Sequence, residues 1–362
     1  SADWPMPRRM ALLALLDGEG SESSDFSDAP AELRSWLAAC RALQSQPAGL
    51  PEACRHNLPD WLAAALQASM TQQPQDFWPL AEALLQAAPL DLRVNAMKAK
   101  RPAVAAALAA SGIQTQETPW SPWGLRVAGK PRLAHLPAWQ QGLVQVQDEG
   151  SQLLALLTQA RRGQLVVDFC AGAGGKTLAL GAMMRGAGRL YAFDASAHRL
   201  QGLQPRLARS GLGNVHTAAI AHERDARLNA LQGKADAVLV DAPCSGLGTL
   251  RRAPGLKWRT RPEDIARLAE QQFSIAQSAA RLVKPGGRLV YATCSLLPQE
   301  NEAVAQALSN ALPGFAPLHA GDVLAAAKVP QAARLTTEAG HLRLWPHLHG
   351  TDGFFAAVWQ RR

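Results

Sequence analysis

The apolar residues in the first 78 positions recur at the spacing of α-helices. Two sets each fall on one helical face: Leu33, Trp36, Leu37, Cys40 and Leu43, and then Trp61, Leu62, Ala65, Leu66 and Met70. The stretch 18–28 is polar and rich in Gly, Ser and acidic residues, which predicts a solvated loop. Residues 1–78 are therefore predicted to form a helical region.

A different pattern begins near position 79. Apolar and polar residues alternate over 90–95, which predicts a strand, and the segment 102–110 reads as a helix. Two further extended segments are predicted at 124–127 and 143–146. A helix among several strands indicates a small α+β module, which we place at residues 79–141.

Basic and aromatic residues gather in this predicted module. The basic ones are Arg93, Lys98, Lys100, Arg101, Arg126, Lys130 and Arg132, and the tryptophans are Trp120, Trp123 and Trp139. This combination suits contact with nucleic-acid phosphates and stacking on bases. It equally fits a solvated basic face above a core that contains the tryptophans, and the pattern alone leaves both interpretations open.

Short apolar strands alternate with helices from about Gly142 to the end of the chain. Strands are predicted at 164–169, 189–193, near Val215, and at 237–240, 288–291 and 354–359, and helices from 176, at 197–210, at 262–283 and from 299. Such alternation indicates an α/β fold with a mostly parallel, doubly wound sheet. Since ligands of these sheets bind beyond the carboxyl ends of the strands, we expect the chemistry in residues 142–362.

Composition and charge narrow the function classes. With 362 residues, 48% of them hydrophobic, the chain is long enough for two or three domains and a sizeable core. A formal net charge of +8 favours a polyanionic partner such as nucleic acid or a membrane surface. The apolar run 10–16 is too short to span a membrane, and nothing else approaches eighteen uninterrupted apolar residues, so no membrane partner is expected.

The cysteines indicate a reducing compartment. They are few and contain no CxxC pair: Cys40, Cys54, Cys170, Cys244 and Cys294. This usage argues against a disulfide scaffold and against a zinc site, so we expect no metal and a cytoplasmic location. The histidines have no ligand spacing, and nothing in the sequence indicates an obligate protein partner.

A glycine-rich turn follows the strand 164–169 and precedes a helix. It fits neither the GxGxxG pattern of dinucleotide sites nor a P-loop, since Phe169 stands where a P-loop needs its first glycine. Asp194, at the end of the next strand, is placed to bind ribose hydroxyls, and Asp225 is the candidate acid after the third strand. These residues predict a nucleoside ligand without a pyrophosphate, and S-adenosyl-L-methionine fits that description.

Two cysteines each follow directly on a predicted strand, in Asp241-Ala242-Pro243-Cys244-Ser245-Gly246 and in Tyr291-Ala292-Thr293-Cys294-Ser295. In a parallel sheet both thiols would face one crevice, with the carboxylate of Asp241 beside them. One carboxylate and two thiols can attack, hold and release an electron-poor ring. Alternatively, each cysteine has only a structural role and packs in the core as a small hydrophobic residue, as a lone cysteine at a strand end most often does.

Several ordered motifs carry a family resemblance. They are Asp168-Phe169-Cys170-Ala171-Gly172-Ala173-Gly174-Gly175-Lys176-Thr177, the Pro-Cys segment with the following Arg251-Arg252 and Lys257-Trp258, and the Thr-Cys-Ser segment with Glu300-Asn301-Glu302. Together with 92–95 they span about residues 80–310 and resemble the RsmB/Nop/Sun family of RNA cytosine-5 methyltransferases. The resemblance implies a Rossmann-like methyltransferase sheet preceded by a small RNA-contacting domain. One departure is Ala173, where the family more often has proline.

The resemblance implies a role for each motif residue. Cys294 would be the nucleophile that adds to cytosine C6, Cys244 would assist the release of the product, and Asp241 would bind the base at N3 and the exocyclic amine. Lys176 would position the base or Asp241. The implied S-adenosyl-L-methionine site consists of Cys170, Ala171, Gly172, Ala173, Gly174, Gly175, Lys176, Asp194, Asp225 and Asp241. The implied RNA contacts are Arg93, Arg251, Arg252 and Lys257.

The sequence is therefore identified as that of an RNA cytosine-5 methyltransferase, with small-subunit ribosomal RNA as the expected substrate. Transfer RNA is the first alternative. A second is an RNA-binding ribosome assembly factor that keeps the fold without the chemistry, and a third is a methyltransferase for DNA or protein. Both thiols and Asp241 are retained, which favours catalysis.

Overall fold

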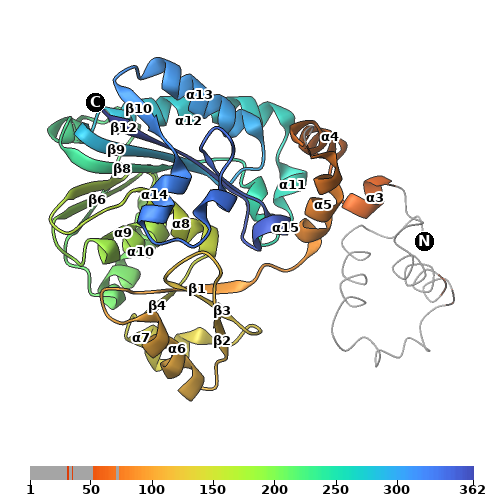
Figure 1. Ribbon diagram of the computed structural model, residues 1–362, viewed down its shortest axis with the longest axis horizontal. Helices are drawn as coiled ribbons and strands as arrows, with labels where there is room; N and C mark the ends of the chain where they lie inside the picture. Colours follow the sequence, from red (N-terminus) through yellow and green to blue (C-terminus); the bar gives the residue numbers. More distant parts are fainter. Residues whose placement is uncertain (1–30, 32–34, 36–51, 71–72) are drawn as a thin grey trace. The chain divides into compact units, whose positions relative to one another are not determined.

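The computed structural model describes residues 31, 35, 52–70 and 73–362 (Figure 1). The chain divides into two compact units, Ser1–Leu58 and Pro59–Arg362. In the first unit the structure describes the short helix α3 (Glu52–His56), beyond which the Leu58 amide donates to His56 Nδ1. The predicted loop 18–28, the helical face 33–43 and the apolar run 10–16 lie outside the described residues.

The second unit begins with two helices that the apolar spacing predicts. They are α4 (Asp60–Ser69) and α5 (Phe77–Leu85), joined through the 3-10 turn η3 (Pro74–Asp76). Leu62, Leu66 and Leu80 are fully buried, so each helix turns an apolar face inward.

A small antiparallel sheet follows, with strand order β2-β3-β1-β4. Its elements are β1 (Leu90–Val94), α6 (Arg101–Ala110), β2 (Thr115–Glu117), β3 (Gly124–Val127), η4 (Leu133–His135), α7 (Pro137–Gln140) and β4 (Val144–Val146). Leu92, Val104, Leu108 and Leu125 form its core, since the alternating residues of β1 and the apolar face of α6 point to the same side. The predicted strand, helix and two extended segments are confirmed, while the short polar β2 had no hydrophobic signal.

The remaining strands form an eight-stranded sheet in the order β10-β12-β9-β8-β5-β6-β7, with β11 paired to β12. The strands are β5 (Leu165–Asp168), β6 (Arg189–Asp194), β7 (Val215–Ala219), β8 (Ala235–Asp241), β9 (Val283–Thr293), β10 (Phe315–Leu318), β11 (Leu342–Leu344) and β12 (Phe354–Arg361). The five strands β5 to β9 pair in parallel, and β12 runs antiparallel to β9. This confirms the predicted α/β fold with a mostly parallel, doubly wound sheet.

Helices cover both faces of the large sheet (Figure 1). The helices and turns are α8 (Glu149–Leu157), α9 (Gly175–Met183), α10 (Ala197–Ser210), η5 (Ala226–Leu231), η6 (Leu247–Thr249), α11 (Leu256–Arg259), α12 (Pro262–Ala280), η7 (Pro298–Glu300), α13 (Glu302–Ala311), α14 (Ala320–Ala326), η8 (Ala332–Leu335) and α15 (Pro346–His349). Apolar residues of α8, α9 and α14 form one core with the sheet, and those of α12 and α13 form the other. No helix among the described residues is both long and apolar enough to span a membrane.

The order of the strands fixes where a ligand can bind. The chain starts at β5 in the middle of the sheet, moves outward through β6 and β7, and returns to the other side of β5 with β8 and β9. The loops after β5 and β8 therefore leave the sheet in opposite directions and open a crevice at its carboxyl edge.

Candidate active site

The glycine-rich turn joins β5 to α9 at this crevice. Gly172 and Gly174 have φ angles of 54° and 84°, and a Cβ atom at Gly174 would lie 2.0 Å from Leu203 Cδ1. Glycine is therefore required at 174 both by the backbone angle and by the neighbouring side chain. A Cβ atom at Gly172 would meet nothing within 4 Å, so the turn faces open space there.

Two acidic residues line the turn. Asp194, at the end of β6, accepts hydrogen bonds from the amides of Gly172 and Ser196, both at 2.8 Å. Asp168, at the end of β5, is buried and accepts from the Thr177 hydroxyl at 2.7 Å, but its Oδ1 atom has no partner. Burial raises the pKa of Asp168 to about 7. We did not single out Asp168 in the sequence, although its place as the last residue of the strand before the turn is a usable signal.

The turn residues fit a nucleoside-bearing cofactor. A polar pocket forms at the carboxyl ends of β5 and β6. It contains open space in front of Gly172, the carboxyl groups of Asp168 and Asp194, and the buried Oδ1 atom of Asp168, which has no hydrogen-bond partner. Cys170 is half-buried within it, and burial raises the pKa of its thiol well above the ordinary value, which keeps it neutral. Ala171 donates its amide to the Phe193 carbonyl, and the Ala173 carbonyl accepts from Arg206.

The carboxylate of Asp225 accepts hydrogen bonds from the backbone of its own loop. It precedes η5, accepts from the amides of Ala221 and Arg227 at 3.0 Å each, and these backbone donors lower its pKa. The loop follows β7, the neighbour of β6, so it lies on the side of the sheet that the sequence predicts. Its part in a cofactor site stays a prediction.

Lys176 and Asp241 form an ion pair in the crevice. The Lys176 Nζ atom lies 2.6 Å from Asp241 Oδ2, and the side chains are 12% and 27% exposed. Burial alone would lower the pKa of Lys176, but the charge and hydrogen bond of Asp241, together with Cys294, raise it. The ammonium group is therefore held charged beside both Asp241 and the Cys294 sulfur.

The two cysteines that sequence reasoning paired lie together. Because β8 and β9 are adjacent parallel strands, with Asp241 opposite Ala292, the loops after them leave the sheet side by side. The Sγ atoms of Cys244 and Cys294 are 3.3 Å apart. The hydrogen bond to Cys294, and then burial, raise the pKa of Cys244 well above the ordinary value. A raised pKa keeps the proton on Cys244, so its thiol is able to donate to the Cys294 sulfur, although either sulfur of the pair can be the donor.

A buried carboxylate links the residues that follow the two cysteines. Glu300 Oε1 accepts from the Ser245 amide at 2.8 Å and from Gln272 Nε2 at 2.9 Å, and Oε2 accepts from the hydroxyls of Ser245 and Ser295 at 2.5 Å each. Next to it, Asn301 accepts from the Thr293 hydroxyl and donates to the Ser295 carbonyl at 3.0 Å. We had noted these residues only as part of a motif, because the contacts that they make are not visible in the sequence.

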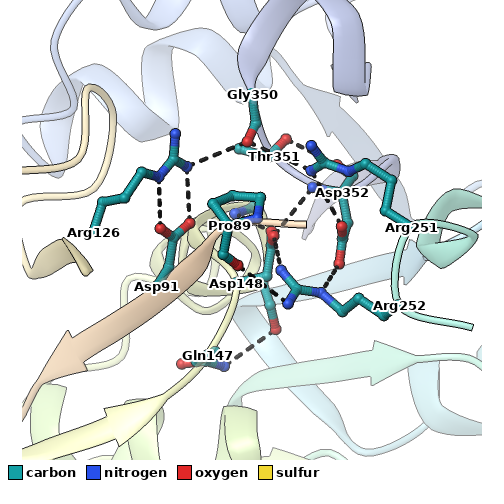
Figure 2. Close-up of polar contacts among 12 residues, drawn as sticks. Pro89, Asp91, Arg126, Gln147, Asp148, Arg251, Arg252, Gly350, Thr351 and Asp352 are labelled. Carbon is teal, nitrogen blue, oxygen red and sulfur yellow. Dashed lines mark hydrogen bonds and ion pairs between the residues drawn. The ribbon is translucent and has the colours of Figure 1, made fainter. Parts of the chain in front are cut away.

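The structure places Arg251 and Arg252, which the resemblance implies as RNA contacts, in ion pairs within the protein, and their part in RNA binding stays a prediction. Figure 2 shows both guanidinium groups turned toward Asp352: Arg251 reaches Oδ1 at 3.2 Å, and Arg252 reaches Oδ2 at 2.5 Å and Asp148 Oδ2 at 2.9 Å. Arg251 is 7% exposed, so its charge is neutralised inside the protein. These arginines hold the segment after the Pro-Cys loop against the loop that precedes β12.

Arg93 is also an internal anchor. It is 3% exposed, and its Nη1 atom donates to Gln147 Oε1 and to the Gly175 carbonyl at 2.7 Å. Burial lowers its pKa to about 9. Arg93 thus ties β1 to the start of α9, and its part in RNA contact stays a prediction. Nearby, Asn95 donates to the carbonyls of Gly142 and Ser210.

The tryptophans of the small module are buried or half-buried. Trp120 is buried, Trp123 is half-buried against two cores, and Trp139 is half-buried beneath the Arg209 guanidinium at 4.3 Å. Arg126 makes a bidentate ion pair with buried Asp91 and donates to the Gly350 carbonyl, as Figure 2 shows. The tryptophans therefore serve as core residues here.

One aromatic side chain faces solvent on the helix that follows the Pro-Cys segment, with a buried lysine beside it. On α11, Trp258 is 61% exposed and the Lys257 Nζ atom lies 5.5 Å from its ring centre. Lys257 itself is 6% exposed, and burial lowers the pKa of its ammonium group. The side chain of Leu256 packs next to Gly246, so α11 is attached to the loop that carries Cys244. Among the described residues no group of histidine, cysteine and carboxylate side chains is arranged to hold a metal ion.

Comparison with known families gives two matches. A family model described as 16S rRNA methyltransferase RsmB/F matches residues 155–360, and one described as an RsmF/B-like, ferredoxin-like domain matches residues 58–133. The first covers the large sheet from α8 to β12. The second covers α4 to β3 and extends to the start of η4.

Curated relatives carry the same description. Probable ribosomal RNA small subunit methyltransferase B of Bacillus subtilis is 35% identical over 271 residues, 75% of this chain and 59% of that protein. Ribosomal RNA small subunit methyltransferase B of Photorhabdus laumondii is 32% identical over 328 residues, 89% of this chain and 72% of that protein. This chain thus spans about three fifths of the Bacillus relative's length.

Solved structures share the fold. A methyltransferase homolog protein from Pyrococcus horikoshii is 27% identical with a TM-score of 0.70, over 86% of this chain and 97% of that one. The structure of NSun6 from Pyrococcus horikoshii with SFG has a TM-score of 0.71 at 20% identity, over 84% of this chain and 98% of that one.

Proposed function

The chain belongs to the 16S rRNA methyltransferase RsmB/F family, and on that premise we propose that it methylates carbon 5 of a cytosine in RNA, with S-adenosyl-L-methionine as methyl donor. One observation carries the proposal: two thiols 3.3 Å apart lie beside the Lys176–Asp241 ion pair at the carboxyl edge of the sheet. A pair of buried hydrophobic cysteines would need neither the carboxylate nor the ammonium group.

Cys294 is the nucleophile in this proposal. C5 of cytosine is a poor nucleophile, and it gains electron density when a thiolate adds to C6. The new S–C6 bond pushes the electrons of the C5–C6 double bond through the ring toward C5 and N3. The Cys294 sulfur lies 3.3 Å from the Cys244 sulfur and interacts with the Lys176 ammonium group, and a cation next to the sulfur is typical of a cysteine that acts as a nucleophile.

Asp241 binds the ring as it takes up charge. A carboxyl group that donates to N3 must carry or share a proton. The Lys176 ammonium, 2.6 Å from Asp241 Oδ2, is the neighbouring proton donor. The second carboxylate oxygen is then available for the exocyclic amine of the base. Lys176 in this scheme sets the position and proton of Asp241.

The cofactor would be held by the turn from Cys170 to Lys176, by Asp194 for the ribose hydroxyls, and by Asp225 and Asp241. When bound, S-adenosyl-L-methionine supplies an electrophilic methyl group. The open space in front of Gly172 and the carboxylate of Asp194 support this placement.

Product release reverses the addition. The C5 proton leaves to a base, its electron pair restores the C5–C6 double bond, and the S–C6 bond breaks with its electrons returning to Cys294. The thiol of Cys244, 3.3 Å from that sulfur, donates to it as the negative charge returns. Without this donor the covalent adduct should persist.

RNA contact is proposed at α11. Trp258 is exposed, carries Lys257 beside it and belongs to a helix attached to the Pro-Cys loop. A nucleobase next to the target can stack on the exposed ring, and Lys257 supports that ring from the protein side. The target base itself must leave its stack to reach Cys294.

Small-subunit ribosomal RNA is the proposed substrate, because the curated relatives are named for it. Transfer RNA is the alternative, and an assembly factor that binds without catalysis is a second. We propose a cytoplasmic location, where thiols stay reduced. The proposed domains are a helical region (1–78), an RNA-contacting module (79–141) and the methyltransferase domain (142–362).

Methyl transfer from labelled S-adenosyl-L-methionine tests the proposal, with small-subunit ribosomal RNA and transfer RNA as parallel substrates. We expect Cys294→Ala to lose transfer, Cys244→Ala to accumulate a covalent protein–RNA adduct, and Cys54→Ala, an exposed free cysteine, to behave like the parent. An adduct trapped by Cys294→Ala instead would reverse the two roles. Transfer that survives both substitutions would refute the mechanism, and loss of 5-methylcytosine from cells lacking the gene identifies the RNA.

A further inference from the structure

Glu300 is a buried carboxylate whose described partners are all neutral. It ends η7, is 0% exposed, and its two oxygens accept from the Ser245 amide, two hydroxyls and the Gln272 amide. Four donors satisfy the charged form. A buried carboxylate held by hydrogen bonds and not by a cation keeps its negative field in the surroundings, where the two thiols lie.

The hydroxyl groups of Ser245 and Ser295 are directed at this carboxylate. Each hydroxyl has one hydrogen, and each donates it to Glu300 Oε2 at 2.5 Å, while the amide of Leu297 donates to Ser295 Oγ at 3.1 Å. The two serine oxygens are 3.2 Å apart. Since Ser245 follows Cys244 and Ser295 follows Cys294, a single oxygen atom fixes the residues that come directly after both thiols.

Charges of opposite sign act on the two thiols. The Glu300 charge is among the causes that raise the pKa of Cys244, after the hydrogen bond to Cys294, burial and the charge of Cys294. The Lys176 ammonium interacts with Cys294. The negative field of Glu300 thus disfavours a thiolate at 244.

We propose that Glu300 is a positioning residue that holds the two cysteine loops in register and directs ionisation to Cys294, so that Cys244 remains the proton donor. The role in catalysis rests on the proposed function, because it concerns the same two thiols. Glu300 touches neither sulfur and acts through Ser245, Ser295 and its charge.

Alkylation of the free protein tests the charge effect without substrate. Iodoacetamide is applied between pH 6 and 10, and the modified Cys244 and Cys294 peptides are quantified by mass spectrometry. In the parent we expect Cys294 to react first. In Glu300→Gln, the lost charge should raise Cys244 reactivity relative to Cys294 by about tenfold, the equivalent of one pKa unit.

Two matched variants separate charge from general disruption. Glu302→Gln removes a neighbouring carboxylate that is 38% exposed and lies 3.8 Å from Arg343, and it should leave the order of alkylation unchanged. Glu300→Asp keeps the charge and should keep the order, with a lower kcat because the shorter side chain cannot reach all four donors. Circular dichroism and Tm establish that each variant is folded.

Serine variants test the register independently. Ser245→Ala and Ser295→Ala each keep the Glu300 charge but release one cysteine loop, so kcat should fall about tenfold with little change in KM for RNA, a loss of about 1.4 kcal/mol in transition-state stabilisation. These variants decide the matter if Glu300→Gln does not fold.

The outcomes are distinct. A folded Glu300→Gln protein with the parent's alkylation order would overturn the charge role, and serine variants with the parent's kcat would overturn the register role. A parent protein in which Cys294 reacts before Cys244, but which methylates no RNA, would contradict the proposed function. It would leave the proposed effect of the Glu300 charge on the two thiols intact.

Discussion

The carboxylate of Asp148 offers a quantitative test of the ion-pair network in Figure 2. Its side chain is 6% exposed and accepts from Arg252 at 2.9 Å, the Asp352 amide at 3.1 Å and the Gly150 amide at 2.8 Å. Burial, and then the charge of Asp352, raise its pKa from 3.8 to about 6, although Arg252 opposes them. The folded protein therefore binds a proton at Asp148 more readily than the unfolded chain does.

The sign of the pH dependence follows from this shift. An acid whose pKa is raised on folding contributes most stability when it is protonated, below pH 3.8, and that contribution is lost as pH rises to about 6. One pKa unit corresponds to about 1.4 kcal/mol, so the loss is about 2 kcal/mol between pH 4 and pH 7. Asp148→Asn cannot ionise and should lack this loss.

Urea unfolding of parent and variant, followed by tryptophan fluorescence at each pH, measures the difference in the free energy of unfolding. The difference should move in favour of Asp148→Asn by about 2 kcal/mol from pH 4 to pH 7, whatever constant offset the amide introduces. Asp264→Asn is the control with the opposite sign. The Arg261 amide, and then Arg267, lower the pKa of Asp264, so this variant should lose ground to the parent as pH rises through 4. A difference for Asp148→Asn that stays constant over the whole range would refute the reasoning.

Three further substitutions test the site. Arg93→Met removes the hydrogen bond to the Gly175 carbonyl, so cofactor affinity measured by calorimetry should fall while the salt dependence of RNA binding stays unchanged; a smaller salt slope would restore Arg93 as a phosphate contact. Gly174→Ala places a Cβ 2.0 Å from Leu203 at a φ of 84°, and should cost about 1–3 kcal/mol of stability in thermal unfolding; an unchanged Tm would contradict the packing. Trp258→Ala should weaken RNA binding by about 1–3 kcal/mol in filter-binding assays, and Trp258→Phe should recover most of it; equal losses in both would exclude stacking.

Strands β5 to β9 and β12 were predictable because glycine, proline and acidic residues separate their apolar runs, and so were helices α9, α10, α12 and α13. The elements β10, β11, α8, α14 and α15 were not predicted from the sequence. The place of Cys244 and Cys294 was equally accessible, since parallel strands bring successive loops to one edge. The polar strand β2 gave no such signal, because pairing with β3, and not side-chain pattern, makes it a strand.

The fate of the arginines was not predictable from local sequence. Arg252 forms ion pairs with Asp148 and Asp352, which are about a hundred residues before and after it in the sequence. The residues next to Arg252 give no indication of these partners. Arg251 and Arg252 were therefore assigned to RNA contact from the family resemblance. Glu300 was missed for the same reason: its donors come from two loops and a helix that meet only in the folded sheet.

The anchoring of β1 to the methyltransferase sheet limits how this chain can be dissected. Arg93 donates to the Gly175 carbonyl at the start of α9, and Asn95 donates to the Ser210 carbonyl at the end of α10. Each thus supplies a hydrogen-bond donor to a backbone carbonyl of the methyltransferase sheet's helices. A fragment trimmed to begin after Asn95 would leave both carbonyls without these donors, and the Gly175 carbonyl belongs to the turn proposed to hold the methyl donor. Loss of activity in such a fragment would then report a distorted cofactor turn, even if the missing residues never touch RNA.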